Sequence, residues 1–173
     1  HKAYGTPLVE GQALLQLGRY EEAMASFREA LARADAGERP HVLHEMGVAA
    51  LDHGAYPEAE EHLRALVREE GYPYLAQAYA DLAEALYRQG RYQEAEAAAR
   101  EAVARGAVAA GELVLGHVAY DLLHLEEALE HYRKAAESAE EGSREWVGAQ
   151  EMVVDTLAQL GYRFPEEMVR RGQ

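Results

Sequence analysis

Hydrophobic residues follow a repeating pattern along this chain. Four alanines, at positions 23, 59, 95 and 128, recur at intervals of 36, 36 and 33 residues. Four residues after each alanine comes a second position of the pattern, occupied by Phe27, Leu63, Ala99 and Tyr132. Residues four apart share one face of an α-helix, so each pair predicts a helix with a buried face. The regular spacing predicts four copies of one helical unit.

Turn signals divide the chain into short helices. Gly18, Gly54 and Gly90 stand where one helix of a unit should end, a position at which glycine tolerates a left-handed backbone. Ser143 is the expected N-cap of a later helix. The resulting prediction is a chain of helices over residues 7–17, 20–34, 40–53, 56–70, 73–89, 92–105, 109–122, 125–140, 144–160 and 165–171.

The repeated motif resembles that of a known family. Residues 18–30, 54–66 and 90–102 carry variants of Gly-x-Tyr-x-x-Ala-x-x-x-aromatic-x-x-Ala, and the fourth copy keeps Leu125-Glu126-Glu127-Ala128. This motif, with a period of about 34 residues, resembles the tetratricopeptide repeat (TPR), in which each repeat is a pair of antiparallel helices, A and B. The resemblance implies an all-α fold, a right-handed α-solenoid of about four repeats plus a C-terminal capping helix.

The resemblance implies one repeat domain over residues 1–173. Its repeats are expected at about 6–37, 40–71, 73–106 and 109–141. A helix over 143–160 carries Trp146, Val153 and Leu160 on one side. We expect this helix to cap the stack, because the last repeat of a solenoid otherwise exposes its apolar face. A short tail helix is expected over 165–171.

Charge and missing residue types disfavour several classes of function. The net charge of −14 at pH 7 opposes binding to nucleic acid and to anionic membranes. The chain has no cysteine, so it has no disulfide, no thiolate nucleophile and no cysteine-bound metal. No apolar segment approaches the roughly 20 residues of a membrane span. We therefore expect a cytoplasmic protein that binds neither nucleic acid nor membrane.

The sequence offers little for catalysis. His41 and His44 have a spacing that suits one metal ion, with Glu84 as a third ligand, but such surface pairs more often bind none. The segment 106–111 has the glycine spacing of a phosphate loop, but no Lys and Ser/Thr follow it. A His-Glu-x-x-His motif and a Gly-x-Ser-x-Gly elbow are both absent. We expect no enzymatic activity, no metal and no cofactor.

The resemblance also implies a binding surface, because the A helices of the family line a concave groove that accepts peptides. The branch of the family that grips a C-terminal carboxylate uses Asn, which this chain lacks, so we do not expect that ligand. An acidic groove with aromatic residues suits a basic or mixed apolar-basic segment, although Tyr87 and Tyr120 have packing between repeats as an alternative role. The phase of the A helices places in the groove Gln12, Gln16, His41, His44, Gln77, Asp81, Glu84, Tyr87, Arg88, His117, Tyr120 and Asp121.

These features favour a non-enzymatic scaffold or adaptor for protein–protein interaction, which binds a protein or peptide in this groove. Two alternatives remain open. One is a structural module that self-assembles through its C-terminal region, where Trp146, Val147, Met152 and Met168 would pair two chains in a homodimer. The other is the ligand-sensing TPR domain of a larger regulator.

Overall fold

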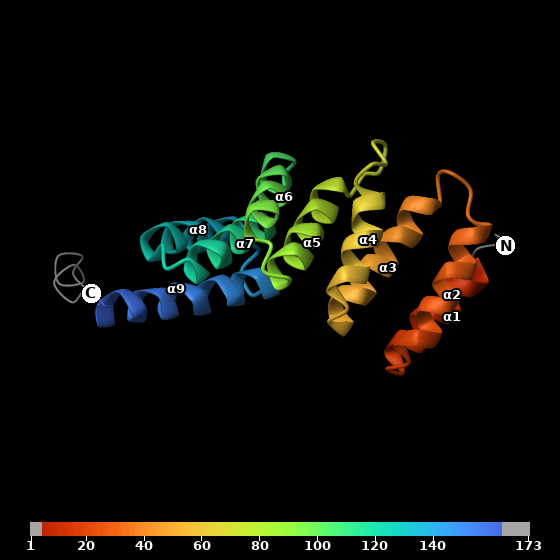
Figure 1. Cartoon of the computed structure of the whole chain (residues 1–173), viewed down its shortest axis with the longest axis horizontal. Helices are drawn as coiled ribbons and strands as arrows, with labels where there is room; N and C mark the ends of the chain where they lie inside the picture. The colour runs from red at the N-terminus through yellow and green to blue at the C-terminus, as the bar shows by residue number, and fades with distance from the viewer. Residues whose placement is uncertain (1–4, 164–173) are drawn as a thin grey trace.

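A computed structural model describes residues 5–163 of the chain, and this range is α-helical without a β-strand. The helices stack along one long axis, with the first and the last at opposite ends (Figure 1). They are α1 (Gly5–Gln16), α2 (Tyr20–Arg33), α3 (Arg39–His53), α4 (Tyr56–Leu66), α5 (Leu75–Arg88), α6 (Tyr92–Ala104), α7 (Val108–Asp121), α8 (Leu125–Ser138) and α9 (Arg144–Arg163).

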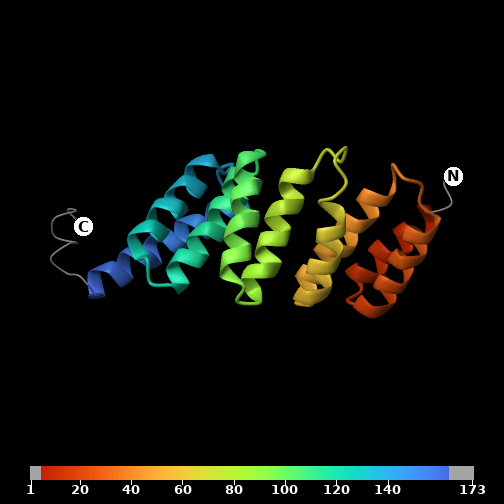
Figure 2. The same ribbon diagram turned by 45° about the horizontal axis from the view of Figure 1, so that its top comes forward.

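Consecutive helices pack as hairpins, α1 with α2, α3 with α4, α5 with α6 and α7 with α8, and α9 packs against α8 and α7. Figure 2 shows the hairpins side by side along the stack. The predicted all-α solenoid with a closing helix is therefore confirmed. The hydroxyl of Ser143 accepts a hydrogen bond of 3.2 Å from the backbone N–H of Trp146, as expected for the N-cap of α9. The tail helix expected over 165–171 lies outside the described residues.

The connection between α4 and α5 is longer than the sequence predicted. The helix expected to reach residue 70 ends at Leu66, and the next begins at Leu75 instead of residue 73. The intervening residues form turns, in which the N–H of Glu69 donates to the carbonyl of Leu66 and that of Tyr72 to the carbonyl of Glu69. Tyr72 is buried in this loop, which anchors the loop to the hairpins.

Small residues allow the two helices of each hairpin to approach closely. The four repeated alanines are fully buried. The A helices carry glycine at 11, 47 and 116, where an added methyl group would meet Phe27, Leu63 or Tyr132 at 2.5 to 2.6 Å. In the third hairpin Ala83 and Ala99 are both buried. The pattern read from the sequence thus marks the line along which helices A and B touch.

Left-handed residues end the A helices. Gly18, Gly54 and Gly90 have φ of 75°, 84° and 74°, as their place in the motif predicted. In the fourth hairpin Leu123 occupies the same place with φ of 63°. A leucine in this conformation has a steric cost that glycine avoids.

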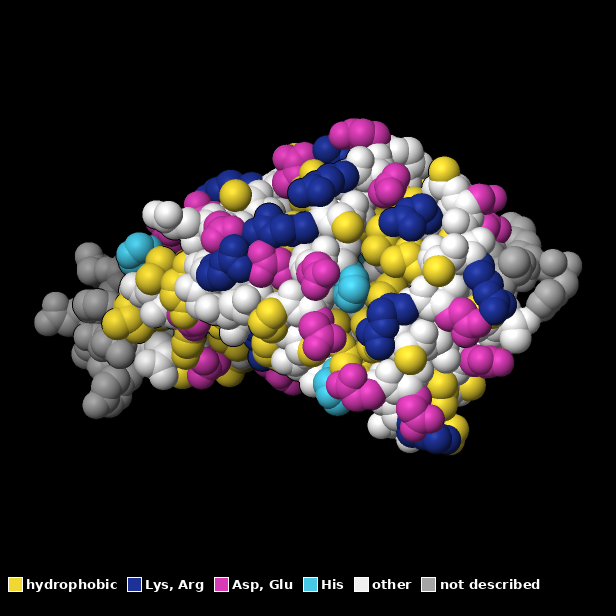
Figure 3. Space-filling model, turned by 45° about the vertical axis from the view of Figure 1, so that its right-hand side comes forward, with side chains coloured by type: hydrophobic (Ala, Val, Ile, Leu, Met, Phe, Trp, Pro, Cys, Tyr) yellow, Lys and Arg dark blue, Asp and Glu magenta, His cyan; other side chains and the backbone are white. Residues whose placement is uncertain are grey.

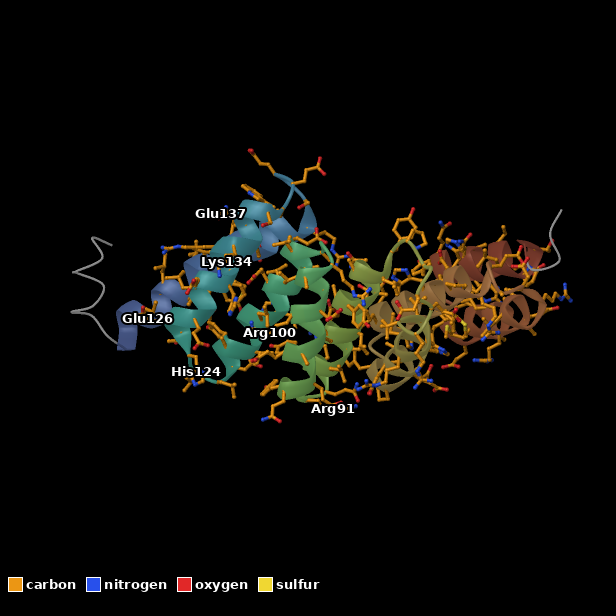
Figure 4. All side chains as sticks on the ribbon, turned by 90° about the horizontal axis from the view of Figure 1, so that it is seen from above. Arg91, Arg100, His124, Glu126, Lys134 and Glu137 are labelled. Carbon is orange, nitrogen blue, oxygen red and sulfur yellow. The ribbon has the colours of Figure 1, made fainter. Side chains whose placement is uncertain are left out.

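Charged side chains cover the exposed faces. Figure 3 shows acidic and basic side chains interspersed with hydrophobic ones on one face of the molecule. Arg100 on α6 and Lys134 and Glu137 on α8 project from their ribbons (Figure 4). Ion pairs also join neighbouring hairpins: Arg64 to Glu94 at 2.8 Å and Arg91 to Glu60 at 2.5 Å. Over residues 5–163 no helix combines the length and the apolarity that a bilayer crossing requires.

Candidate binding groove

A groove of about 430 Å³ runs along the A helices α3, α5 and α7 and reaches the first turn of α9. Side chains three and four residues apart on each helix face it, which is why one stripe of each sequence segment lines it. Its apolar lining consists of Val48, Leu51, Ala80, Ala110, Leu113 and Val114. Its other lining residues are His44, Asp52, Gln77, Asp81, Glu84, Tyr87, Arg88, His117, Arg144 and Glu145.

A hydrogen-bonded chain centred on His44 forms one wall. Its Nδ1 lies 2.6 Å from the hydroxyl of Tyr72, and its Nε2 lies 2.8 Å from a carboxylate oxygen of Asp81. The amide of Gln77 donates to the other oxygen of that carboxylate at 2.9 Å. Because both ring nitrogens are engaged, the His44 ring has a fixed orientation and ties α3 to α5.

Stacked rings form another part of the lining. The ring of Tyr87 stacks on that of His117 with centroids 5.4 Å apart, and Nδ1 of His117 lies 2.7 Å from the hydroxyl of Tyr132. Burial lowers the pKa of His117 below its ordinary value, and the positive charge of Arg88 lowers it further. Burial also raises the pKa of Tyr87 to about 12. Both rings are therefore uncharged at neutral pH and present polar atoms without a net charge.

The groove carries more acidic than basic side chains. Its carboxylates are Asp52, Asp81, Glu84 and Glu145, and its guanidinium groups are Arg88 and Arg144. The walls displace water around Glu84 and raise the pKa of its carboxyl, an effect that Arg88 opposes. Within residues 5–163 neither Glu84 nor Arg88 forms an ion pair closer than 4 Å. The guanidinium of Arg88 stands 6.0 Å from the centroid of the Tyr56 ring, a contact that leaves its charge without a counter-ion. Both charged groups can therefore meet a ligand.

The structure brings together part of the set predicted from the sequence. His44, Gln77, Asp81, Glu84, Tyr87, Arg88 and His117 all line the groove. His41 lines a neighbouring pocket of about 330 Å³. Gln12 sits beside Glu45, to which its amide donates a long hydrogen bond of 3.4 Å, and Gln16 is exposed in the last turn of α1.

Tyr120 and Asp121 do not line the groove. The Tyr120 hydroxyl donates to Asp155 of α9 at 2.5 Å, and Asp121 accepts a hydrogen bond of 2.9 Å from the Tyr92 hydroxyl. These contacts join α7 to α9 and α6 to α7. The alternative role of packing between repeats therefore applies to Tyr120, whereas Tyr87 both packs against His117 and lines the groove.

Sequence reasoning missed the two residues through which α9 lines the groove. Arg144 and Glu145 come from its first turn, next to the N-cap that the sequence indicated. The cap signal locates the start of the helix but not the direction in which its first turn points. Sequence reasoning also missed Tyr72, whose signal was a pair of tyrosines on either side of Pro73 in a segment assigned to helix ends.

In residues 5–163 the histidines do not gather around a common metal position. The second nitrogen of His44 lies on Asp81, not on Glu84. In the part of the chain that the structure describes, no three His, Asp or Glu side chains form a metal-binding group. His131 and Glu112 form a further His–carboxylate pair, at 2.6 Å between α8 and α7, which is a partly buried polar contact inside one hairpin.

Comparison with protein families identifies the repeat. Models of the tetratricopeptide repeat match residues 9–36 and 44–110, which together make up more than half of the chain. No curated protein matches its sequence.

Solved structures share the fold. MamA, residues 41 to the end, from Desulfovibrio magneticus RS-1 superposes with a TM-score of 0.71 at 20% identity, covering 99% of this chain and 97% of that one. BtubC (BKLC) from P. vanneervenii has a TM-score of 0.74 at 17% identity, covering 93% and 74%. PilF of Pseudomonas aeruginosa has a TM-score of 0.71 at 14% identity, covering 95% and 78%. At these identities the likeness concerns the fold alone.

Proposed function

Because the chain belongs to the tetratricopeptide repeat family, we propose that it is a non-enzymatic scaffold that holds a protein or peptide segment in the groove along α3, α5 and α7. The observation that carries the proposal is the pair of Glu84 and Arg88. These charged groups stand one turn apart over an apolar lining, and each is without an ion-pair partner among the described residues. Charged groups held in this way in a partly dry groove suit a complementary ligand.

The partner we propose is a basic or mixed apolar-basic segment. The four carboxylates of the groove exceed its two guanidinium groups, so a cationic side chain gains more than an anionic one. The apolar lining offers area for a hydrophobic side chain between charged contacts. His44 and Asp81 already bond to each other, so Asp52, Glu84 and Glu145 are the carboxylates left to meet the ligand.

Fluorescence polarisation with two labelled peptides of equal length tests the proposal. One peptide alternates Lys and Leu, and the other alternates Glu and Leu. We expect the Lys-Leu peptide to bind more tightly and to weaken as salt is raised. Comparable binding of the Glu-Leu peptide would contradict the proposed partner chemistry.

A matched pair of variants distinguishes peptide binding in the groove from attraction by the net negative charge of the protein. Glu84→Arg should weaken binding of the Lys-Leu peptide by about tenfold or more, the effect of losing and reversing one charge-assisted contact. Glu137→Arg changes the net charge equally but lies on the outer surface of α8 (Figure 4) and should change binding little. If both variants weaken binding equally, the affinity of the peptide depends on the net charge of the protein, and the groove is not the binding site.

Self-assembly through the C-terminal region stays a prediction. Val147 is exposed on α9, but Trp146 is half-buried and Met152 packs against the core near Tyr132. Met168 lies outside the described residues. Much of the apolar surface assigned to a dimer is thus used to close the solenoid, which favours the scaffold over a tail-to-tail dimer. The cytoplasmic location also stays a prediction.

A further inference from the structure

A second pocket, of about 330 Å³, lies at the α1 end of the groove. It is formed by α1, α3 and the loop that joins α4 to α5. Four of its lining residues are rings, His41, His44, Tyr72 and Tyr74, and the others are Leu8, Glu45 and Val48. The proposed scaffold function uses His44, with its bond to Tyr72, as a wall of the main groove and gives the rings of His41 and Tyr74 no role.

The rings are arranged around Tyr72. Its ring stands nearly perpendicular to those of His41 and His44, at 79° in both cases, with centroids 5.3 and 5.5 Å away. Tyr74 meets it at 71° and 5.6 Å. Perpendicular neighbours turn ring faces in several directions, and the face of an aromatic ring carries its negative potential.

The pocket is held in shape without a ligand. Tyr72 is buried, and its hydroxyl is fixed by the hydrogen bond to His44. Tyr74 follows after one proline and is 59% exposed, so core packing does not account for its position. A ligand that met Tyr72 and His44 would not have to order these two rings first, which lowers the cost of binding.

The charge of the pocket is negative. Glu45 contributes a carboxylate whose contact within residues 5–163 is the long bond from Gln12, and no Lys or Arg is among the lining residues. Burial, with the nearby carboxylates of Asp81 and Glu45 contributing, raises the pKa of Tyr72 to about 12, so its ring stays neutral at physiological pH. An anion would be repelled here, and a neutral group would leave the carboxylate unused.

We propose that this pocket binds a quaternary or N-methylated ammonium group. Such a group is a weakly hydrated cation with an apolar surface, and ring faces beside a carboxylate attract it through cation–π and ionic contacts. Two sources present this chemistry: a free small molecule such as choline, or a methylated lysine side chain in a protein. This proposal does not require the main groove to bind a peptide, because Glu84 and Arg88 are not among the residues that line this pocket.

Isothermal titration calorimetry with choline and with 3,3-dimethyl-1-butanol tests the proposal on the wild-type protein. The two molecules have nearly the same shape, but the alcohol has carbon in place of the charged nitrogen. We expect choline to bind at least about fivefold more tightly than the alcohol, in line with a cation–π and ionic contribution. Equal affinities, or no heat of binding for choline at millimolar concentrations, would overturn the proposal.

Substitutions of pocket residues test whether choline binds in this pocket. Tyr74→Ala should weaken choline binding by about 3- to 30-fold, and Tyr74→Phe, which keeps the ring, should bind like the wild type. Glu45→Gln should weaken it several-fold. Tyr79→Ala is the matched control, because Tyr79 packs under Arg105 away from this pocket. Unchanged affinity in Tyr74→Ala would overturn the assignment, and since Tyr74 is exposed, this variant is expected to fold.

A third comparison distinguishes the source and separates this site from the main groove. A short peptide with trimethyllysine that binds at least tenfold more tightly than choline assigns a protein ligand, and equal affinity assigns a free small molecule. Glu84→Arg should leave choline binding unchanged. If that variant abolished choline binding while Tyr74→Ala did not, the cation would be binding in the main groove and this proposal would be wrong.

Discussion

The hydroxyl of Tyr132 lies 2.7 Å from Nδ1 of His117, and this contact joins the buried core of the fourth hairpin to the wall of the groove. The tyrosine is fully buried and occupies the position that holds Phe27 and Leu63 in earlier repeats. Its ring passes over Gly116, where no side chain blocks it. The core residue thereby sets the orientation of a groove residue.

Tyr132→Phe tests how much this contact contributes to the free energy of unfolding. The change removes the hydroxyl without removing the ring and leaves Nδ1 of His117 without its partner. We expect the free energy of unfolding to fall by about 1 kcal/mol, the usual net value of a partly buried hydrogen bond. Urea unfolding followed by circular dichroism measures it. Tyr79→Phe, whose hydroxyl has no hydrogen bond among the described residues, should change stability by less than about 0.5 kcal/mol.

The depressed pKa of His117 predicts a pH dependence. In the folded chain burial and Arg88 hold this pKa below 6.5, the ordinary value that applies after unfolding, although Asp121 opposes the shift. Between the two pKa values the unfolded chain binds more protons, so the contribution of His117 to stability is present at neutral pH and is lost as the pH falls through this window.

Comparison with His117→Gln isolates this contribution. The stability difference between wild type and variant should shrink as the pH is lowered from about 7 to about 5, because glutamine does not titrate. Urea unfolding at a series of pH values measures the difference, and other titrating groups cancel between the two proteins. A difference that stays constant with pH would show that burial of His117 does not affect its protonation.

Two glycines inside helices, one packed against a ring and one in open space, should respond oppositely to substitution by alanine. An alanine methyl group at 116 would meet the Tyr132 ring at 2.5 Å, so Gly116→Ala should cost about 1 to 3 kcal/mol by overpacking. Gly148 lies within α9 with no atom within 4 Å of the new methyl group, so Gly148→Ala should gain up to about 1 kcal/mol of helix propensity. Thermal unfolding of the two variants checks both signs. Stabilisation by Gly116→Ala would disprove the close approach of α7 and α8.

Leu123 predicts a stabilising substitution. It has φ of 63° and is 57% exposed, so its side chain contributes little burial while its backbone is strained. Leu123→Gly should relieve the strain and raise the free energy of unfolding by about 0.5 to 1 kcal/mol after the entropy cost of glycine. Leu122→Gly, at an ordinary φ of −84°, should lower it instead. Chemical denaturation of both variants distinguishes them, and equal effects would argue against strain at residue 123.

The sequence indicated the helices that line the groove, but it was less informative about the residues at the ends of those helices. His41 lies outside the groove, in the neighbouring pocket. Helix phase otherwise selects residues of α3, α5 and α7 that line the groove, because the 3.6-residue period repeats within each helix. It failed for Tyr120 and Asp121, since these end α7, where α6 and α9 approach and hydroxyl–carboxylate contacts take both side chains. Spacing along one helix carries no information on which neighbour covers its last turn.

The sequence by itself determined the repeated helical hairpin, through alanines and glycines that only a close helix pair requires, and through left-handed turns at Gly18, Gly54 and Gly90. Those signals are local, so they can be read within about 35 residues. The tertiary structure alone decided that Arg144 enters the groove, that Tyr132 reaches His117, and that Tyr72 gathers three rings around it. These relationships depend on the angle between hairpins and on the path of a loop, which many weak contacts set together and no single motif encodes.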